Sequence, residues 1–153
     1  MESTREIRGV MIPVSGGSVL LPNATVAEVI SYVAPAAVDG APPWLLGTIT
    51  WRGWHLPLVS FPVLVGIADS EASESARIAV LKALSGDSRL QFIAMLVQGF
   101  PRLTTVTPDL LIPTGDAGGR AAGVHSEVLV REDRAYIPDL GAIEDMVLAA
   151  LPA

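Results

Sequence analysis

Cysteine is absent from the 153 residues, and only two histidines are present. The absence of cysteine excludes thiolate catalysis, disulfides, iron–sulfur clusters and the commonest zinc sites, and it fits a reducing cytoplasm. The histidines, His55 and His125, lie far apart, and neither belongs to an H-x-x-x-H spacing that would bring two metal ligands together. We therefore expect no metal and no cofactor.

Positive charge is also scarce. Ten Lys and Arg stand against 16 Asp and Glu, which gives a net charge of −6. A field of this sign repels phosphate backbones and anionic lipid, so nucleic acid is not an expected partner. Proline, glycine or charge interrupts the apolar runs well before the ~20 residues that a membrane-spanning helix requires. The polar N-terminus does not have the pattern of a signal peptide, so we expect a soluble protein without membrane insertion.

Short apolar runs separated by turn residues make up most of the chain, which contains 14 Gly and 12 Pro. This pattern is typical of an all-β sandwich or barrel. Nine strands are predicted, at 10–14, 18–21, 48–51, 54–60, 76–84, 90–97, 103–112, 124–131 and 134–137. Hairpin turns at 15–17, 52–53, 85–88 and 132–133 predict antiparallel pairing.

Helices are predicted in three places. Residues 23–30 have cap residues for a short helix, and 42–46 could form one turn that begins with proline. Residues 139–151 have the clearest helical pattern, because Asp139 can cap a stripe of apolar residues at spacings of three and four. Such a stripe is more often core than partner site.

The acidic, small-residue segment 69–75 divides the chain. Strands are predicted on both sides of it, so we expect one domain, 1–153, in which two small barrels share an interface. The predicted ranges are about 10–68 for the first barrel region, 76–138 for the second and 139–151 for the C-terminal helix. A glycine-rich stretch at 114–123 is predicted to be a loop without a phosphate-binding motif.

No catalytic set of residues emerges. The serines at 15 and 18 lie in a predicted turn and lack the G-x-S-x-G order of a nucleophile elbow. The most informative segment is 42–57, Pro-Pro-Trp-Leu-Leu-Gly-Thr-Ile-Thr-Trp-Arg-Gly-Trp-His-Leu-Pro, which predicts Arg52 at a hairpin tip between Trp51 and Trp54. Trp and Arg are enriched in interface hot spots, which favours a binding module. The alternative is a surface arginine that merely stacks on one of these rings, worth about 0.5–1 kcal/mol.

Three successive segments resemble the CheW-like domain family. Residues 26–29, 41–53 and 56–61 are similar in order and interval to its Val-x-Glu-Ile, Pro-x-(aromatic)-x-x-Gly-x-x-Asn-Leu-Arg-Gly and (apolar)-Pro-(apolar)-(apolar)-x-(apolar) succession. The resemblance continues through 78–81, 94–100 and 135–140, and covers about 10–146.

The resemblance implies two five-stranded SH3-like barrels without catalytic activity or cofactor. It implies a cytoplasmic scaffold between chemoreceptor tips and the regulatory domain of a histidine kinase. Glu28 and Arg52 match a glutamate and an arginine that lie near one another at the family's partner-binding surface. Glu28 on its predicted helix could instead serve only as a cap or a solvated side chain. Gly47 and Gly53 match turn glycines.

Thr50, Trp51 and Trp54 surround the arginine and complete the predicted protein-binding set with Glu28, Arg52 and Gly53. The family's apolar groove positions match Val26 and Ile49, but core packing is the preferred interpretation for both.

Three positions depart from the family pattern: Thr50 replaces Asn, Trp51 replaces Leu, and Gln98 replaces Asp. The Trp-Arg-Gly turn resembles accessory CheW-like proteins of chemosensory systems that control type IV pilus motility. A second hypothesis remains open, namely a small-ligand-binding β-barrel or an enzyme with a site between the barrels. An adaptor should have a shallow apolar trough there, whereas a ligand site should be deep and enclosed.

Overall fold

The computed structural model describes residues 7–68, 76–84, 90–106, 111–113, 124–130 and 133–150. The strands are β1 (Ile7–Val14), β2 (Gly17–Pro22), β3 (Val26–Ser31), β4 (Leu45–Trp51), β5 (Trp54–Val59), β6 (Arg77–Lys82), β7 (Phe92–Val97), β8 (Arg102–Val106), β9 (Leu111–Pro113), β10 (Val124–Val130) and β11 (Asp133–Pro138). The helices are the 3₁₀ turn η1 (Asn23–Thr25), α1 (Phe61–Val65) and α2 (Leu140–Ala150). The prediction of a mainly β chain with few helices is confirmed.

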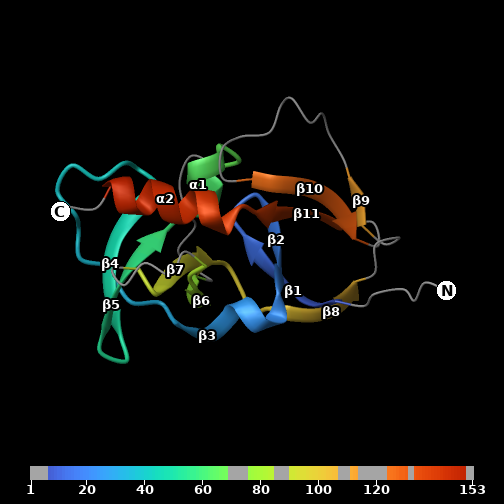
Figure 1. The fold of residues 1–153 in the computed structure, drawn as a ribbon, viewed down its shortest axis with the longest axis horizontal. Coiled ribbons are helices and arrows are strands. Elements are labelled where there is room, and N and C mark those ends of the chain that lie inside the picture. Colours follow the sequence, from blue (N-terminus) through green and yellow to red (C-terminus); the bar gives the residue numbers. More distant parts are fainter. Residues whose placement is uncertain are drawn as a thin grey trace.

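The strands form two sheets. One has six strands in the order β8-β1-β2-β11-β10-β9, and the other has five in the order β3-β6-β7-β5-β4. They occupy the right and left of Figure 1, and α2 extends from β11 across the five-stranded sheet. Neighbouring strands are antiparallel, except that β2 pairs parallel with β11 and β5 pairs parallel with β7.

The two sheets do not follow the predicted ranges 10–68 and 76–138. Strands β1 and β2 belong with β8–β11, whereas β6 and β7 belong with β3–β5. The composition of 69–75 marks a break in the apolar pattern. It does not determine which strands pair, because pairing joins residues that are far apart in the sequence. A five-stranded sheet is confirmed for one unit, and the other has six strands. Segments 69–75 and 114–123 lie outside the described residues.

Two of the predicted hairpin turns lie within the described residues and are confirmed, between β1 and β2 and between β4 and β5. The other two turns fall largely outside them, but the flanking strands pair antiparallel, β6 with β7 and β10 with β11. The single strand predicted at 103–112 is wrong. Its two ends form β8 and β9, which lie at opposite edges of the six-stranded sheet.

The helix predicted at 23–30 is also wrong. The cap residues support only η1, and the chain then continues as β3, which pairs with β6. Val26, Val29 and Ile30 are β-branched and suit a strand packed between neighbours, so the tertiary partner overrides the local cap signal. Residues 42–46 form a turn rather than a helix, since the Leu45 N–H donates to the Pro42 carbonyl at 3.0 Å and β4 begins there.

Helix α2 agrees with the prediction for 139–151. The carboxylate of Asp139 accepts a hydrogen bond from the Ala142 N–H at 3.0 Å, and Ile143 and Val147 are buried. The short helix α1 was not predicted. It is capped by the Ser60 hydroxyl, which accepts from the Val63 N–H, but its apolar residues continue the apolar run of β5 and conceal the boundary.

Three buried clusters occur among the described residues: two large cores and a small cluster of Met11, Leu20 and Ala135. The first core joins both sheets and α2, and includes Ile12 and Val19 from the six-stranded sheet, Phe61 from α1, Met95 from β7 and Ile143 from α2. The second core uses residues of the five-stranded sheet alone: Ile49, Leu56, Leu58, Ile78, Val80, Ala94 and Leu96. The five-stranded sheet therefore buries both faces, one against the rest of the molecule and one against itself.

Candidate functional site

The tip of the β4–β5 hairpin is formed by Arg52 and Gly53, between the paired residues Trp51 and Trp54. Both turn residues have positive φ, 48° for Arg52 and 82° for Gly53, as a two-residue type I′ turn requires. Asparagine and glycine adopt this region readily, whereas a long side chain does so at a cost. Within the described residues, Arg52 alone among non-glycine residues has positive φ, and backbone strain of this kind is concentrated at functional sites.

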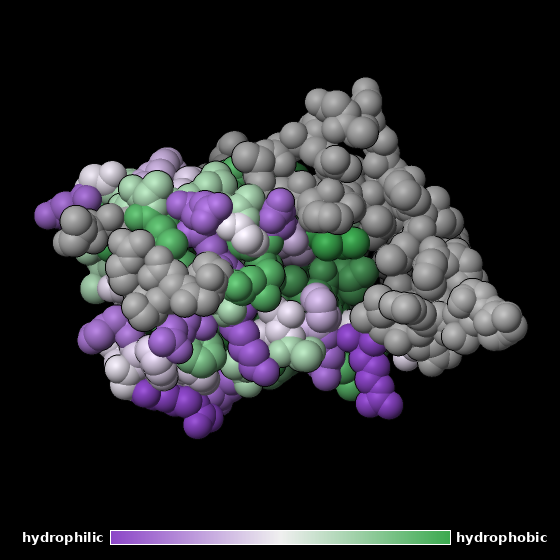
Figure 2. Space-filling view, in the orientation of Figure 1, coloured by the Kyte–Doolittle hydropathy of each residue, from purple (hydrophilic) through white to green (hydrophobic). Residues whose placement is uncertain are grey.

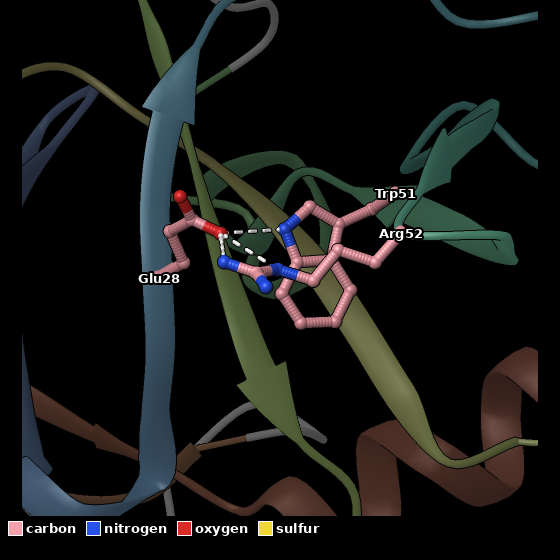
Figure 3. A network of polar contacts seen from close by, with 3 residues as sticks. All are labelled: Glu28, Trp51 and Arg52. Carbon is pink, nitrogen blue, oxygen red and sulfur yellow. Dashed lines mark hydrogen bonds and ion pairs between the residues drawn. The ribbon is translucent and has the colours of Figure 1, made fainter.

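Glu28 is positioned by an irregularity in β3. Val26 pairs with Leu81 and Glu28 with Val80, so β3 contains one extra residue relative to β6 at this point. A β-bulge of this kind bends the strand and re-aims the side chains beside it. Glu28 lies on β3, not on a helix as predicted, and its side chain points toward the β4–β5 hairpin (Figure 3).

Three hydrogen bonds converge on one oxygen of Glu28 (Figure 3). The indole N–H of Trp51 donates to Oε1 at 2.8 Å, and Arg52 donates to the same oxygen from Nη2 at 3.1 Å and from Nε at 3.3 Å. The Arg52 guanidinium also lies 5.2 Å from the centre of the Trp51 ring, within cation–π range. The side chain of Arg52 is 68% exposed and that of Glu28 is 38% exposed, so the ion pair is accessible to a partner.

These contacts lower the pKa of Glu28 below its ordinary value of 4.5. The largest cause is the hydrogen bond from Trp51, followed by the hydrogen bond from Arg52, and the positive charge of Arg52 adds to both. Partial desolvation acts in the opposite direction and is outweighed. Glu28 is therefore ionised at neutral pH, and the site presents a carboxylate and a guanidinium side by side.

The contact between Glu28 and the hairpin also shows how the five-stranded sheet is shaped. Strands β3 and β4 are its two edges. In a flat sheet with strands about 4.8 Å apart, edges separated by four intervals would be about 19 Å apart. A hydrogen bond of 2.8 Å between their side chains requires the sheet to curl. Trp51 packs against the second core, so the sheet curls around that core.

Three aromatic rings pack together beside the β4–β5 hairpin. Phe92, the first residue of β7, has its ring centre 5.0 Å from that of Trp51 and 5.5 Å from that of Trp54, both in edge-to-face geometry at 64°. Trp51 and Phe92 are half-buried and pack against the second core, while Trp54 is 40% exposed. Such pairs favour stability by about 0.5–1.5 kcal/mol beyond the area that they bury. The rings therefore form a partly exposed cap beneath the ion pair.

The structure brings together Glu28, Trp51 and Arg52, and places Gly53 and Trp54 beside them. Thr50 is exposed on β4, and its hydroxyl lies 3.4 Å from Nδ1 of His55 on β5. Hydrophilic residues gather along the lower left edge of the face in Figure 2, the region in which the hairpin lies in Figure 1.

One expectation is corrected. Gly47 is not a turn glycine. It lies within β4 with φ of 146°, where a Cβ would collide with the carbonyl of Ala36. Val26 and Ile49 pack in the cores, in agreement with the role preferred for both from the sequence.

Phe92 was missed at the sequence level. It begins an apolar run, and nothing local identifies its partners across the sheet. The signal for Trp51 was present, because residues i and i+2 of a strand share a face and Trp51 follows the buried Ile49 at that interval.

Other features of the described residues are less informative. A shallow depression of about 240 Å³ is lined by Arg8, Asn23, Leu103, Thr104 and Thr105, and these residues do not include a pair of carboxylates or a histidine. No cluster of three potential metal ligands occurs in the described ranges. No helix within them is long and apolar enough to span a membrane.

Comparison with known proteins identifies the family to which this chain belongs. The sequence profile of the CheW-like domain matches residues 8–146, so the chain belongs to the CheW-like domain family. No curated protein is detectably similar to it in sequence.

Among solved structures, the fold is similar to that of the scaffolding protein TtCheW from Thermoanaerobacter tengcongensis. The TM-score is 0.73 and the sequence identity is 18%, over 89% of this chain and 86% of that protein. At this identity the likeness shows the fold alone, and the fold is that of CheW.

Proposed function

We propose that this chain is a non-catalytic adaptor that couples chemoreceptors to a histidine kinase through protein contacts alone. The observation that carries the proposal is the exposed Glu28–Arg52 ion pair, held at the end of the five-stranded sheet by the neighbouring tryptophan. Membership of the CheW-like family supports the general role of a scaffold in chemotaxis. The partners proposed are the regulatory domain of the kinase and the cytoplasmic tip of the receptor.

The physical character of the site supports a protein partner. Arg52 and Trp54 are exposed residues of the types that dominate interface hot spots, and they are contiguous with a carboxylate. A pair of opposite charges can exchange its internal hydrogen bonds for charge-assisted bonds to a partner. An adaptor of this kind acts in the cytoplasm, where receptor tips and kinase meet, and a chain without cysteine suits that compartment.

The branch of the family is a separate proposal. The Trp-Arg-Gly turn, in which Trp51 replaces the usual leucine, favours an accessory adaptor of a type IV pilus chemosensory system. The test is a pull-down of the chain from its native host, read by mass spectrometry. Recovery of a kinase and receptor encoded with pilus genes supports this branch, whereas recovery of flagellar partners alone contradicts it.

Arg52→Ala tests the general proposal. Loss of a central interface arginine costs about 2 kcal/mol or more at a hot spot, which corresponds to roughly thirtyfold in affinity. We expect this loss in titrations against the kinase regulatory domain or the receptor tip, with a melting temperature close to that of the wild type. Arg102→Ala on β8 is the matched control, since Arg102 is an exposed arginine on the other sheet. Unchanged binding of Arg52→Ala to both partners would refute the proposal.

A further inference from the structure

Trp51 differs from its neighbours at the site in how firmly it is held. Its ring packs against Phe92 and the second core, and it pairs across the hairpin with Trp54. The side chain of Arg52 is 68% exposed, so the core does not restrain it. Of the two residues that donate to Glu28, only Trp51 is therefore anchored in the interior.

The hydrogen-bond distances also indicate that Trp51 holds Glu28 more firmly than Arg52 does. The indole N–H of Trp51 lies 2.8 Å from Oε1 of Glu28, compared with 3.1 and 3.3 Å for the two donors of Arg52. An indole has a single donor with a fixed direction, so the position of the ring determines where the acceptor must lie. Glu28, on an edge strand beside a bulge, would otherwise be free to rotate away from the hairpin.

All three bonds use one oxygen. No described residue donates a hydrogen bond to Oε2 of Glu28, which points away from the network in Figure 3. Trp51 and Arg52 therefore take up the acceptor capacity of Oε1 and leave that of Oε2. The bound oxygen thus fixes the orientation of the carboxylate, and the second oxygen points away from the network on a side chain that is 38% exposed (Figure 3).

We infer that Trp51 is a positioning residue, which anchors Glu28 to the second core so that Oε2 and the Arg52 guanidinium face a partner together as an acceptor and a donor. The part of this inference that concerns the partner rests on the proposed function. The anchoring of Glu28 by Trp51 does not. The recognised chemistry is a complementary donor and acceptor on a protein surface, for example a side-chain amide or an opposite ion pair. Leucine, the usual residue at this position, has no N–H and could not perform this role.

The anchoring is tested in the free protein with Trp51→Phe, which keeps an aromatic ring on Phe92 and removes the N–H. The pKa of Glu28, followed by carbon NMR of its carboxylate, should rise toward its ordinary value because the largest cause of its lowering is lost. Trp54→Phe is the matched control. Its ring meets Phe92 at the same angle of 64°, but within the described residues its indole makes no hydrogen bond to Glu28.

A second measurement applies even if Trp51→Phe fails to fold. In the wild type, the indole N–H resonance of Trp51 should shift with pH as Glu28 titrates, and Glu28→Gln should abolish that shift. An unchanged Glu28 pKa in Trp51→Phe, an equal rise in Trp54→Phe, or an indole resonance that does not respond to Glu28 would each overturn the inference.

Binding separates this inference from the proposed function. Trp51→Phe should weaken binding to the kinase regulatory domain by roughly threefold to tenfold, the range expected for one hydrogen bond. Trp51→Phe could raise the Glu28 pKa and yet leave binding unchanged, while Arg52→Ala still loses binding. That result would overturn the claim that Trp51 positions Glu28 for the partner. If the wild type binds neither the kinase domain nor the receptor tip, the proposed function fails while the anchoring of Glu28 stands.

Discussion

The guanidinium of Arg52 and the carboxylate of Glu28, 3.1 Å apart, connect the two edge strands of the five-stranded sheet. They are separated by 24 positions in the sequence and by three intervening strands in the sheet. Surface ion pairs contribute little to stability in general. This pair lies where the sheet curls upon itself, so the same contact both closes the structural unit and forms the proposed binding surface.

Acid should weaken this contact. The folded-state pKa of Glu28 lies below its ordinary value of 4.5, so its contribution to stability is present above that value and is lost as the pH falls through the folded pKa. Glu28→Gln cannot titrate at this position and lacks that contribution throughout. We expect the melting temperatures of the two proteins to differ at pH 7 and to converge as the pH falls through the folded pKa of Glu28. Parallel melting curves over the whole acid range would contradict this expectation.

Arg52→Asn should separate stability from binding. With φ of 48°, position 52 favours asparagine over other non-glycine residues, and Asn-Gly is a preferred type I′ turn. Alanine at this position keeps the backbone strain, whereas asparagine relieves roughly 1 kcal/mol of it. We expect Arg52→Asn to melt at a higher temperature than Arg52→Ala, and both to lose partner binding.

The measurement is a pair of thermal melts beside a pair of titrations. If Arg52→Asn melts no higher than Arg52→Ala, the turn does not strain Arg52 and its conformation needs no functional explanation. Retention of binding by Arg52→Asn would show that the guanidinium is dispensable.

Local chemistry explains which parts of the fold could be predicted. The turn at 52–53 and the cap at Asp139 were correct because their signals lie within a few residues of the structure that they specify. Strand β3 was missed because its cap residues suggested a helix, and its pairing with β6 depends on residues about 50 positions away. Sheet membership was wrong for the same reason.

The candidate site was predictable only in part. Trp51, Arg52 and Trp54 are adjacent in sequence and their clustering was visible there, but Glu28 joined them only through the family resemblance. Its contact with the hairpin depends on the curl of a whole sheet and on a bulge in β3. Phe92 could not be assigned to the site from its neighbours in sequence, because its ring contacts are made across strands.

Glu144 should be a structural carboxylate. It lies on α2 with 1% of its surface exposed, and it accepts a hydrogen bond from the Leu84 N–H at 2.7 Å. Glu144→Ala removes the acceptor of this partly buried hydrogen bond, which costs about 0.5–1.5 kcal/mol. We expect a clearly lower melting temperature and faster amide exchange at Leu84.

Asp145→Ala is the control for this change, because Asp145 is the next residue of α2 and is exposed. Its melting temperature should stay near that of the wild type. A similar loss in both variants would indicate that the charge near the helix matters rather than the bond to Leu84.

Gly47→Ala should be the most damaging of these substitutions. Gly47 lies within β4, where the segment at Pro35 and Ala36 runs antiparallel beside the strand, so close that a Cβ would collide with the Ala36 carbonyl. That carbonyl accepts from the Thr48 N–H at 2.9 Å, and the Ala36 N–H donates to the Thr48 carbonyl at 2.8 Å. An added methyl group must push this two-bond bridge apart, at an overpacking cost of about 1–3 kcal/mol, and φ of 146° adds backbone strain.

Gly40→Ala separates the two costs of Gly47→Ala. Gly40 also has positive φ, 74°, but nothing lies within 4 Å of an added Cβ, so the backbone cost of about 1–2 kcal/mol acts alone there. In chemical denaturation we expect Gly47→Ala to lose distinctly more free energy of unfolding than Gly40→Ala, with faster amide exchange at Ala36 and Thr48. Equal losses, with both amides still protected, would mean that the segment at Pro35 and Ala36 moves aside freely. The glycine at position 47 would then be required by its backbone conformation and not by the close approach of Ala36.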